Sequence, residues 1–182
     1  MEQLLTLLSE YGLWIVFFGM IVEGTTVIIL SGVLCHMGVL PCEKTIFVAI
    51  LGAVAGDQMW FYLGKNYADK VLSRFPALQA QVQKLQNKVQ SKGNMLAVSS
   101  RFIYGGAVVF PLVLAINQYP HRKFTLLDTL GVSLASLAGL ALGYFLSDSF
   151  KKILGDINHF EHILLFIIVS AVAVKLYYNY KK

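Results

Sequence analysis

The chain has 182 residues, a length that fits one domain, and its composition is far from that of an ordinary soluble protein. Hydrophobic residues make up 57% of the chain and charged residues 14%, with a mean hydropathy of +0.65. This composition indicates an integral membrane protein. The net charge of +5 comes from Lys and Arg residues between apolar segments, and no nucleic-acid motif is present, so we expect membrane lipids and not nucleic acid as partners.

The apolar segments predict an all-α protein in a single membrane domain. In chain order we expect a re-entrant hairpin at residues 11–34, a transmembrane helix at 45–64, a second re-entrant hairpin at 95–117, a transmembrane helix at 124–146 and a C-terminal transmembrane helix at 161–178. Helix breakers favour the hairpins: Gly24 and Gly32 in the first, and Gly105, Gly106 and Pro111 in the second. The alternative for each hairpin is a kinked single span, because membrane helices tolerate Gly and Pro.

The distribution of positive charge supports the two hairpins. If all five segments cross the membrane, Lys and Arg divide almost evenly between the two sides. With two hairpins, eleven Lys/Arg residues lie on one side and only three, Lys44, Lys151 and Lys152, on the other. We therefore expect the connector around Lys84 to face the cytoplasm and the loop from Cys35 to Cys42 to face outward.

A weak internal repeat has an offset of 79 residues. Pro41, Lys44, Leu51, Gly52, Leu63 and Gly64 fall on Pro120, Lys123, Leu130, Gly131, Leu142 and Gly143. Each unit would be a hairpin, a Pro-led turn and a spanning helix, and the single crossing between the units would invert the second relative to the first. Inverted repeats whose broken helices meet at the midplane are typical of transporters.

The segment between the units, residues 66–94, is polar and basic. Its apolar residues recur at helical spacing, which predicts an amphipathic helix, and Pro76 fits a first turn: Val71, Phe75, Leu78, Val82, Leu85 and Val89. We expect this connector to lie on anionic headgroups or on the protein itself.

Two charges inside apolar segments are the first candidates for function. Glu23 and Arg101 each fall within a predicted hairpin, where a charge costs roughly 2.5 to 3.5 kcal/mol and therefore faces a partner or a wet cavity. Arg101 suits an anionic headgroup because its guanidinium offers five donors in a planar fork, and backbone donors at Gly105 and Gly106 add to this site. The alternative is structural, with Glu23 paired to Arg101 to hold the two hairpins together.

Two further acids lie in the predicted spanning helices. Asp57 borders the small-residue face formed by Gly52 and Gly56, and we assign a proton relay to Asp57 and Glu23, with a helix-interface hydrogen bond as the alternative for Asp57. Because Asp57 lies outside both hairpins, we expect it to carry the proton and Glu23 to pair with Arg101. Asp128 reads as an ordinary interfacial residue.

Other constellations carry little signal. Cys35, His36, Cys42 and Glu43 lack a metal-ligand spacing, and one disulfide between the two cysteines is left open. The same holds for His159 and His162. We expect no metal, no cofactor and no enzymatic activity, since the chain has no nucleotide-binding, metalloprotease or serine-nucleophile motif.

In these motifs the chain resembles the DedA family, also called SNARE-associated or VTT-domain proteins. The matching pieces are Glu23-Gly24, Gly56-Asp57 with Gly64, residues 101–105, Pro111, and Pro120-x-Arg122-x-Phe124 leading to Gly131. The resemblance covers roughly residues 11–146. It implies a bacterial inner-membrane protein with two re-entrant hairpins that translocates lipids, with links to undecaprenyl phosphate recycling and to the proton gradient.

The chain departs from the family pattern at two positions. Thr25 stands where a second acid is common, and Ala107 where a second arginine is common. One acid and one base are missing together, so a phosphate site with a single arginine would bind more weakly.

These observations predict a multi-pass transporter in the bacterial inner membrane. The favoured function is proton-linked flipping of an anionic lipid, with polyprenyl (undecaprenyl) phosphate as the substrate. The alternatives are a small-anion transporter or a non-transporting membrane scaffold, and a homo-oligomer is left open. A transporter requires a cavity that reaches Arg101, whereas a scaffold would seal this position with a direct contact between Glu23 and Arg101.

Overall fold

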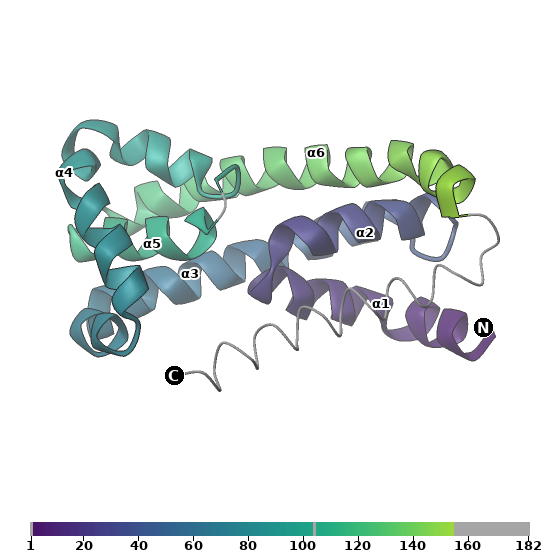
Figure 1. Ribbon diagram of the computed structural model, residues 1–182, viewed down its shortest axis with the longest axis horizontal. Coiled ribbons are helices and arrows are strands. Elements are labelled where there is room, and N and C mark those ends of the chain that lie inside the picture. Colours follow the sequence, from purple (N-terminus) through teal and green to yellow (C-terminus); the bar gives the residue numbers. More distant parts are fainter. Residues whose placement is uncertain (1, 104, 155–182) are drawn as a thin grey trace. The chain divides into compact units, whose positions relative to one another are not determined.

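The residues that the computed structural model describes, 2–103 and 105–154, form α-helices joined by short turns and loops (Figure 1). Its helices are α1 (Glu2–Val22), α2 (Gly24–His36), α3 (Cys42–Arg74), α4 (Pro76–Ser99), α5 (Gly106–Ile116) and α6 (His121–Leu154). The residues up to Tyr144 form one compact unit, to which the contacts below belong. The predicted C-terminal helix at 161–178 lies outside the described residues.

The chain reverses direction at Glu23, between α1 and α2 (Figure 1). Glu23 has an extended backbone (φ −147°, ψ 101°), and its N–H donates to the carbonyl of Gly19, which completes α1. The two helices pack side by side: a Cβ at Gly19 would lie 3.0 Å from Val27. A helical hairpin therefore occupies the predicted range, while its return to the same side of a membrane stays a prediction.

A second reversal separates α4 from α5. Gly105 has a left-handed backbone (φ 76°), which glycine adopts without steric cost, and α5 begins at the next residue. At the end of this hairpin away from the turn, the Tyr119 hydroxyl donates a 2.5 Å hydrogen bond to Asn94 Oδ1.

Two of the predicted helix breakers do not break a helix. Gly32 lies within α2 and Pro111 within α5. Gly32 is needed for close packing instead, because a Cβ there would collide with the backbone of α6 at Leu140. Pro111 is fully buried, and α5 continues through it. The breaks occur at Glu23 and between Ser99 and Gly106, where the chain reverses.

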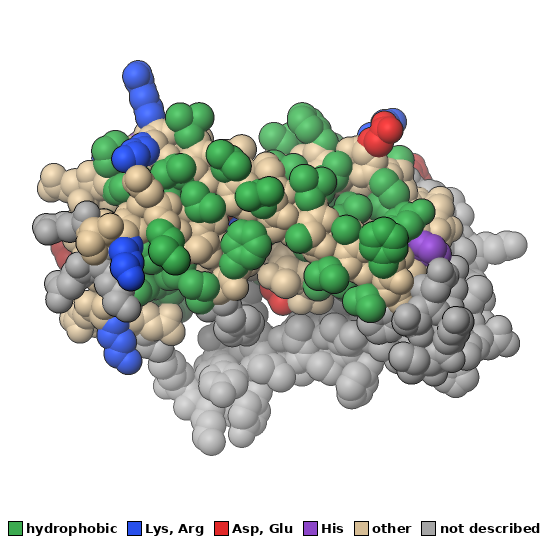
Figure 2. All heavy atoms as spheres, turned by 90° about the horizontal axis from the view of Figure 1, so that it is seen from above, with side chains coloured by type: hydrophobic (Ala, Val, Ile, Leu, Met, Phe, Trp, Pro, Cys, Tyr) green, Lys and Arg blue, Asp and Glu red, His purple; other side chains and the backbone are tan. Residues whose placement is uncertain are grey.

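The two long helices, α3 and α6, run in opposite directions (Figure 1). Both are long and apolar enough to cross a membrane, over Cys42–Arg74 and His121–Ser147, and both extend beyond the ranges predicted for them. Side chains on one face of α6 are exposed, at a spacing that repeats every helical turn: Leu126, Leu130, Leu134 and Leu137. Figure 2 shows hydrophobic side chains spread over this side of the molecule, with Lys and Arg gathered at the α4 end. Such a surface suits contact with lipid.

Glycines in α3 and α6, at equivalent positions of the two predicted repeat units, make matching close contacts. A Cβ at Gly52 would collide with the backbone of α1 at Phe17, and one at Gly131 with α4 at Val98. Farther along, Gly64 packs against α5 at Leu112, and Gly143 against α2 at Ile29. Each long helix therefore packs against the first arm of its own hairpin and the second arm of the other hairpin.

The connector forms parts of two helices. Residues 66–74 complete α3, which is kinked at Tyr67, and α4 begins at Pro76, the first-turn position predicted for it. Val82 and Val89 are buried in a core cluster with α5, so this stripe packs on the protein, while Lys84 is exposed. The apolar stripe of the connector is therefore divided between the end of α3 and α4.

Candidate functional site

A buried ion pair joins Arg101 to Asp57. Arg101 Nη2 donates to Asp57 Oδ1 at 2.7 Å, and Nε donates to Oδ2 at 3.0 Å. The side chains are 9% and 1% exposed. Nη2 also donates to the carbonyl of Ala53, one turn earlier on α3, at 2.7 Å. This bidentate geometry fixes the plane of the guanidinium, so Arg101 holds the second hairpin against α3.

Small residues bring the first hairpin against the same pair. Gly56, next to Asp57, lies so close to α1 that a Cβ there would be 3.1 Å from Ile21 Cα. A Cβ at Gly24 would lie 2.5 Å from Arg101 Nη1. The break between α1 and α2 is therefore adjacent to the edge of the guanidinium that Asp57 does not use.

Glu23 is not the partner of Arg101. Its side chain is exposed and accepts a 2.6 Å hydrogen bond from the Thr26 hydroxyl. The predicted pairing of Glu23 with Arg101 was wrong, because α3 runs behind the break and presents Asp57 to the guanidinium. The roles proposed for Glu23 and Asp57 in moving protons stay predictions.

A cavity of about 540 Å³ opens beside the ion pair. Its lining includes Glu23, Thr25, Thr26, Asp57 and Arg101, from both hairpins and α3. A smaller cavity of about 250 Å³, lined mostly by apolar residues of α1, α2 and α6, also reaches Arg101. The guanidinium thus lies between a polar and an apolar space.

The two other predicted site residues, Gly105 and Gly106, lie in different surroundings. Gly105 lines the larger cavity, as does Ala107, which stands at the position where the family commonly has arginine. Gly106 is buried and packs closely on the turn, since a Cβ there would collide with the carbonyl of Ser100; its predicted role in binding the substrate stays a prediction.

Sequence reasoning missed Asp128. It is fully buried on α6 and accepts a 3.3 Å hydrogen bond from the hydroxyl of Ser100, the residue before Arg101. The signal was present in the sequence: Asp128 lies three residues before Gly131, whose close approach to α4 turns this stretch of α6 inward.

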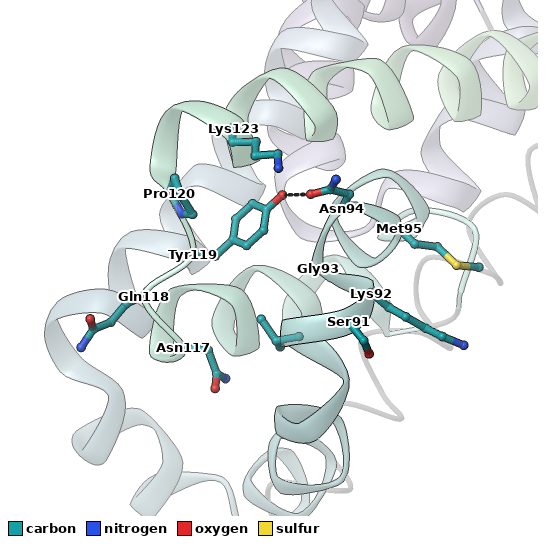
Figure 3. Close-up of a pocket in the computed structure, with 11 residues that line it drawn as sticks. Ser91, Lys92, Gly93, Asn94, Met95, Asn117, Gln118, Tyr119, Pro120 and Lys123 are labelled. Carbon is teal, nitrogen blue, oxygen red and sulfur yellow. Dashed lines mark hydrogen bonds between the residues drawn. The ribbon is translucent and has the colours of Figure 1, made fainter.

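A polar cleft of about 620 Å³ lies elsewhere, between the kink of α4 at Lys92 and the loop before α6 (Figure 3). Tyr119 points across it toward Asn94, and Lys123 Nζ lies 5.9 Å from the Tyr119 ring centre. Burial raises the pKa of the Tyr119 hydroxyl, which keeps it a donor to Asn94. The cleft contains no predicted site residue.

Within the part of the chain that the structure describes, no three His, Cys, Asp or Glu side chains converge as a metal site would require. Cys35 and Cys42 are both free thiols, so the disulfide left open by the sequence is not formed. The second histidine pair considered, His159 and His162, lies outside the described residues.

Comparison with known proteins identifies the family. The sequence profile of the VTT domain matches residues 21–145, more than half of the chain. The chain belongs to the VTT-domain family, also called the DedA family. This range begins at the end of α1 and contains α2, α3, the second hairpin and the site around Arg101, and it confirms the resemblance seen in the sequence.

Curated relatives of this VTT-domain chain are bacterial membrane proteins. It is 29% identical to the inner membrane protein YohD of Escherichia coli, over 93% of the chain and 88% of YohD. It is 23% identical to undecaprenyl phosphate transporter A of Staphylococcus aureus, over 94% of the chain and 93% of that protein. No solved structure matches the chain. The names of the relatives confirm the predicted location in the bacterial inner membrane.

Proposed function

We propose that the chain translocates an anionic lipid across the inner membrane, with a polyprenyl phosphate such as undecaprenyl phosphate as the substrate, and that this movement is linked to protons. The observation that carries the proposal is the cavity beside Arg101, lined by Glu23, Thr25 and Thr26 and adjoined by an apolar space. A lipid phosphate needs both environments, one for its headgroup and one for its chain.

Arg101 retains donors for a phosphate while it is paired. A guanidinium has five N–H donors, and the bonds to Asp57 and Ala53 use one on Nε and two on Nη2. The two on Nη1 remain, next to Gly24. A phosphate oxygen that enters from the cavity therefore meets Nη1 of Arg101 first. The phosphate can then compete with Asp57 for the donors on Nη2 and Nε.

The main alternative is a membrane scaffold. That function predicts a sealed contact between Glu23 and Arg101, whereas Glu23 bonds to Thr26 and the space beside Arg101 is open. The relative named as an undecaprenyl phosphate transporter supports a lipid phosphate as the substrate class, and the neighbouring apolar cavity favours a lipid over a small soluble anion.

The test is flipping in proteoliposomes. Vesicles that contain the purified chain and a fluorescent polyprenyl phosphate are treated with an impermeant quencher, with and without a pH gradient. We expect the quenched fraction to exceed that of empty vesicles and to respond to the gradient. Arg101→Ala should abolish the excess, while the exposed Arg122→Ala serves as the control. Equal quenching in empty and loaded vesicles would reject the proposal.

A further inference from the structure

Asp128 is a buried carboxyl group whose hydrogen bonds are incomplete. It is 0% exposed, and only Oδ1 has a donor, the Ser100 hydroxyl at 3.3 Å. Among the residues that the structure describes, Oδ2 has no hydrogen-bond donor. A buried carboxylate oxygen without a donor is costly, so this group needs either a cation or a proton.

The cation that could serve Asp128 is already engaged. Asp57, on α3, uses both of its oxygens to accept from Arg101. Asp57 and Asp128 are neighbours at this site, because Ser100 donates to Asp128 and the next residue, Arg101, donates to Asp57. Two ionised carboxylates can only accept, so they could not bond to one another. A proton on one of them supplies the missing donor.

The surrounding charges do not offer another solution. Glu23 lines the same cavity as Arg101 and adds negative charge. His121, on the same helix as Asp128, lies 2.7 Å from the side-chain oxygen of Gln58 and not at either carboxyl group. Two ionised acids against one guanidinium would leave a net negative charge in a buried site. One proton makes the site neutral.

We propose that Asp57 and Asp128 form a carboxyl pair that holds one proton between them, with Arg101 as the counter-charge, and that this pair is the proton-binding site of the chain. The pair differs from the relay expected from the sequence, since Asp128 and not Glu23 is the second member. Ser100 is a positioning residue, because its hydroxyl orients Asp128 from the turn that carries Arg101.

The coupling step that follows rests on the proposed function. When a lipid phosphate takes Nη2 and Nε of Arg101, Asp57 loses its counter-charge. The pair then binds a second proton from water in the cavity that Asp57 lines. When the phosphate leaves, Arg101 pairs with Asp57 again and this proton is released. One proton is taken up for each anion bound and one is returned for each anion released.

The pair can be tested without transport, by infrared spectroscopy of the purified chain in detergent at neutral pH. A protonated carboxyl group has a C=O stretch at a higher frequency than an ionised one. We expect the difference spectrum of wild type minus Asp128→Asn to contain the band of one protonated carboxyl group. Asp69→Asn, at an acid away from this site, should leave the band unchanged. A wild type without the band, or Asp128→Asn with the band intact, would overturn the pair.

Stability and proton uptake complete the test. Asparagine resembles a protonated carboxyl group and can donate to Asp57, so Asp128→Asn should melt at the wild-type temperature or above, and a clear fall would contradict a protonated Asp128. Addition of a polyprenyl phosphate to a weakly buffered sample should remove one proton from solution for each lipid bound in wild type, and lipid binding without proton uptake would overturn the coupling step. If the band is present but vesicles show no flipping, only the proposed function fails. If flipping occurs without the band, only the pair fails.

Discussion

At the scale of single residues, the site depends on which carboxylate meets the arginine. Burial of Arg101 in an apolar hairpin could be predicted, because a charge there requires a partner. The choice of Asp57 over Glu23 could not, because it depends on how α3 passes behind the break in the first hairpin. The contact of Gly56 with Ile21 sets this geometry, and no sequence spacing reports it.

The pairing of Arg101 with Asp57 predicts different effects for two neutral substitutions. Asp57→Asn removes a partner from a buried ion pair and should lower the free energy of unfolding by about 3–5 kcal/mol. Glu23→Gln changes an exposed side chain and should leave the free energy of unfolding near the wild-type value. Melting curves of the two variants in the same detergent would measure this. A Glu23→Gln protein that is the less stable of the two would restore the pairing expected from the sequence.

Arg101→Lys tests the planar fork. Lysine keeps the charge, but it cannot donate to both oxygens of Asp57 in one plane and also reach Ala53. We expect flipping to fall by about tenfold or more, while Arg122→Lys, an exposed control, retains it. Initial rates in proteoliposomes at equal protein density provide the measurement, and an Arg101→Lys variant with the wild-type rate would reduce the role of Arg101 to its charge.

At the scale of helices, the apolar segments predicted most of the elements. Four of the five predicted apolar segments correspond to described helices or helical hairpins, and the fifth lies outside the described residues. The breaks were placed less well, because Gly32 and Gly143 serve close packing between α2 and α6, which involves residues more than one hundred positions apart. The sequence alone does not show whether a glycine ends a helix or allows a neighbouring helix to pack closely against it.

The contact between α2 and α6 can be tested by cross-linking. A Cβ at Gly139 would lie 3.7 Å from Ile28 Cβ, within the range of disulfide bonds, and Ile28→Cys removes the methyl group that would block it. In a background of Cys35→Ala and Cys42→Ala, we expect Ile28→Cys with Gly139→Cys to form a disulfide under mild oxidation. Mass spectrometry of the digested protein would detect it.

The matched control for this pair is Ile28→Cys with Leu137→Cys, since Leu137 is exposed on another face of α6. It should remain reduced under the same conditions. Equal cross-linking of both pairs would indicate that α6 moves freely against the first hairpin, contrary to the packing of Gly143.

At the scale of the whole molecule, the repeat predicted from six identities corresponds to matching contacts. Pro41 and Pro120 each precede a long helix, and their carbonyls accept from Thr45 and Phe124 at equivalent positions. The long helices α3 and α6 run in opposite directions (Figure 1), as an inverted repeat requires, and the inverted repeat itself stays a prediction. The sequence could suggest this because prolines and packing glycines tolerate few replacements. The orientation of the chain in the membrane is predicted from its distribution of Lys and Arg residues.

The final prediction is the orientation itself. Lys44 lies on the side with three basic residues and Lys84 on the side with eleven, and both side chains are exposed at opposite ends of the described helices, so they form a matched pair for labelling. In the background without native cysteines, an impermeant thiol reagent added to intact cells, with the outer membrane permeabilised, should modify Lys44→Cys but not Lys84→Cys. Both should react after lysis. Labelling of position 84 alone would invert the topology, and labelling of both in intact cells would mean that the two ends do not lie on opposite sides of the membrane.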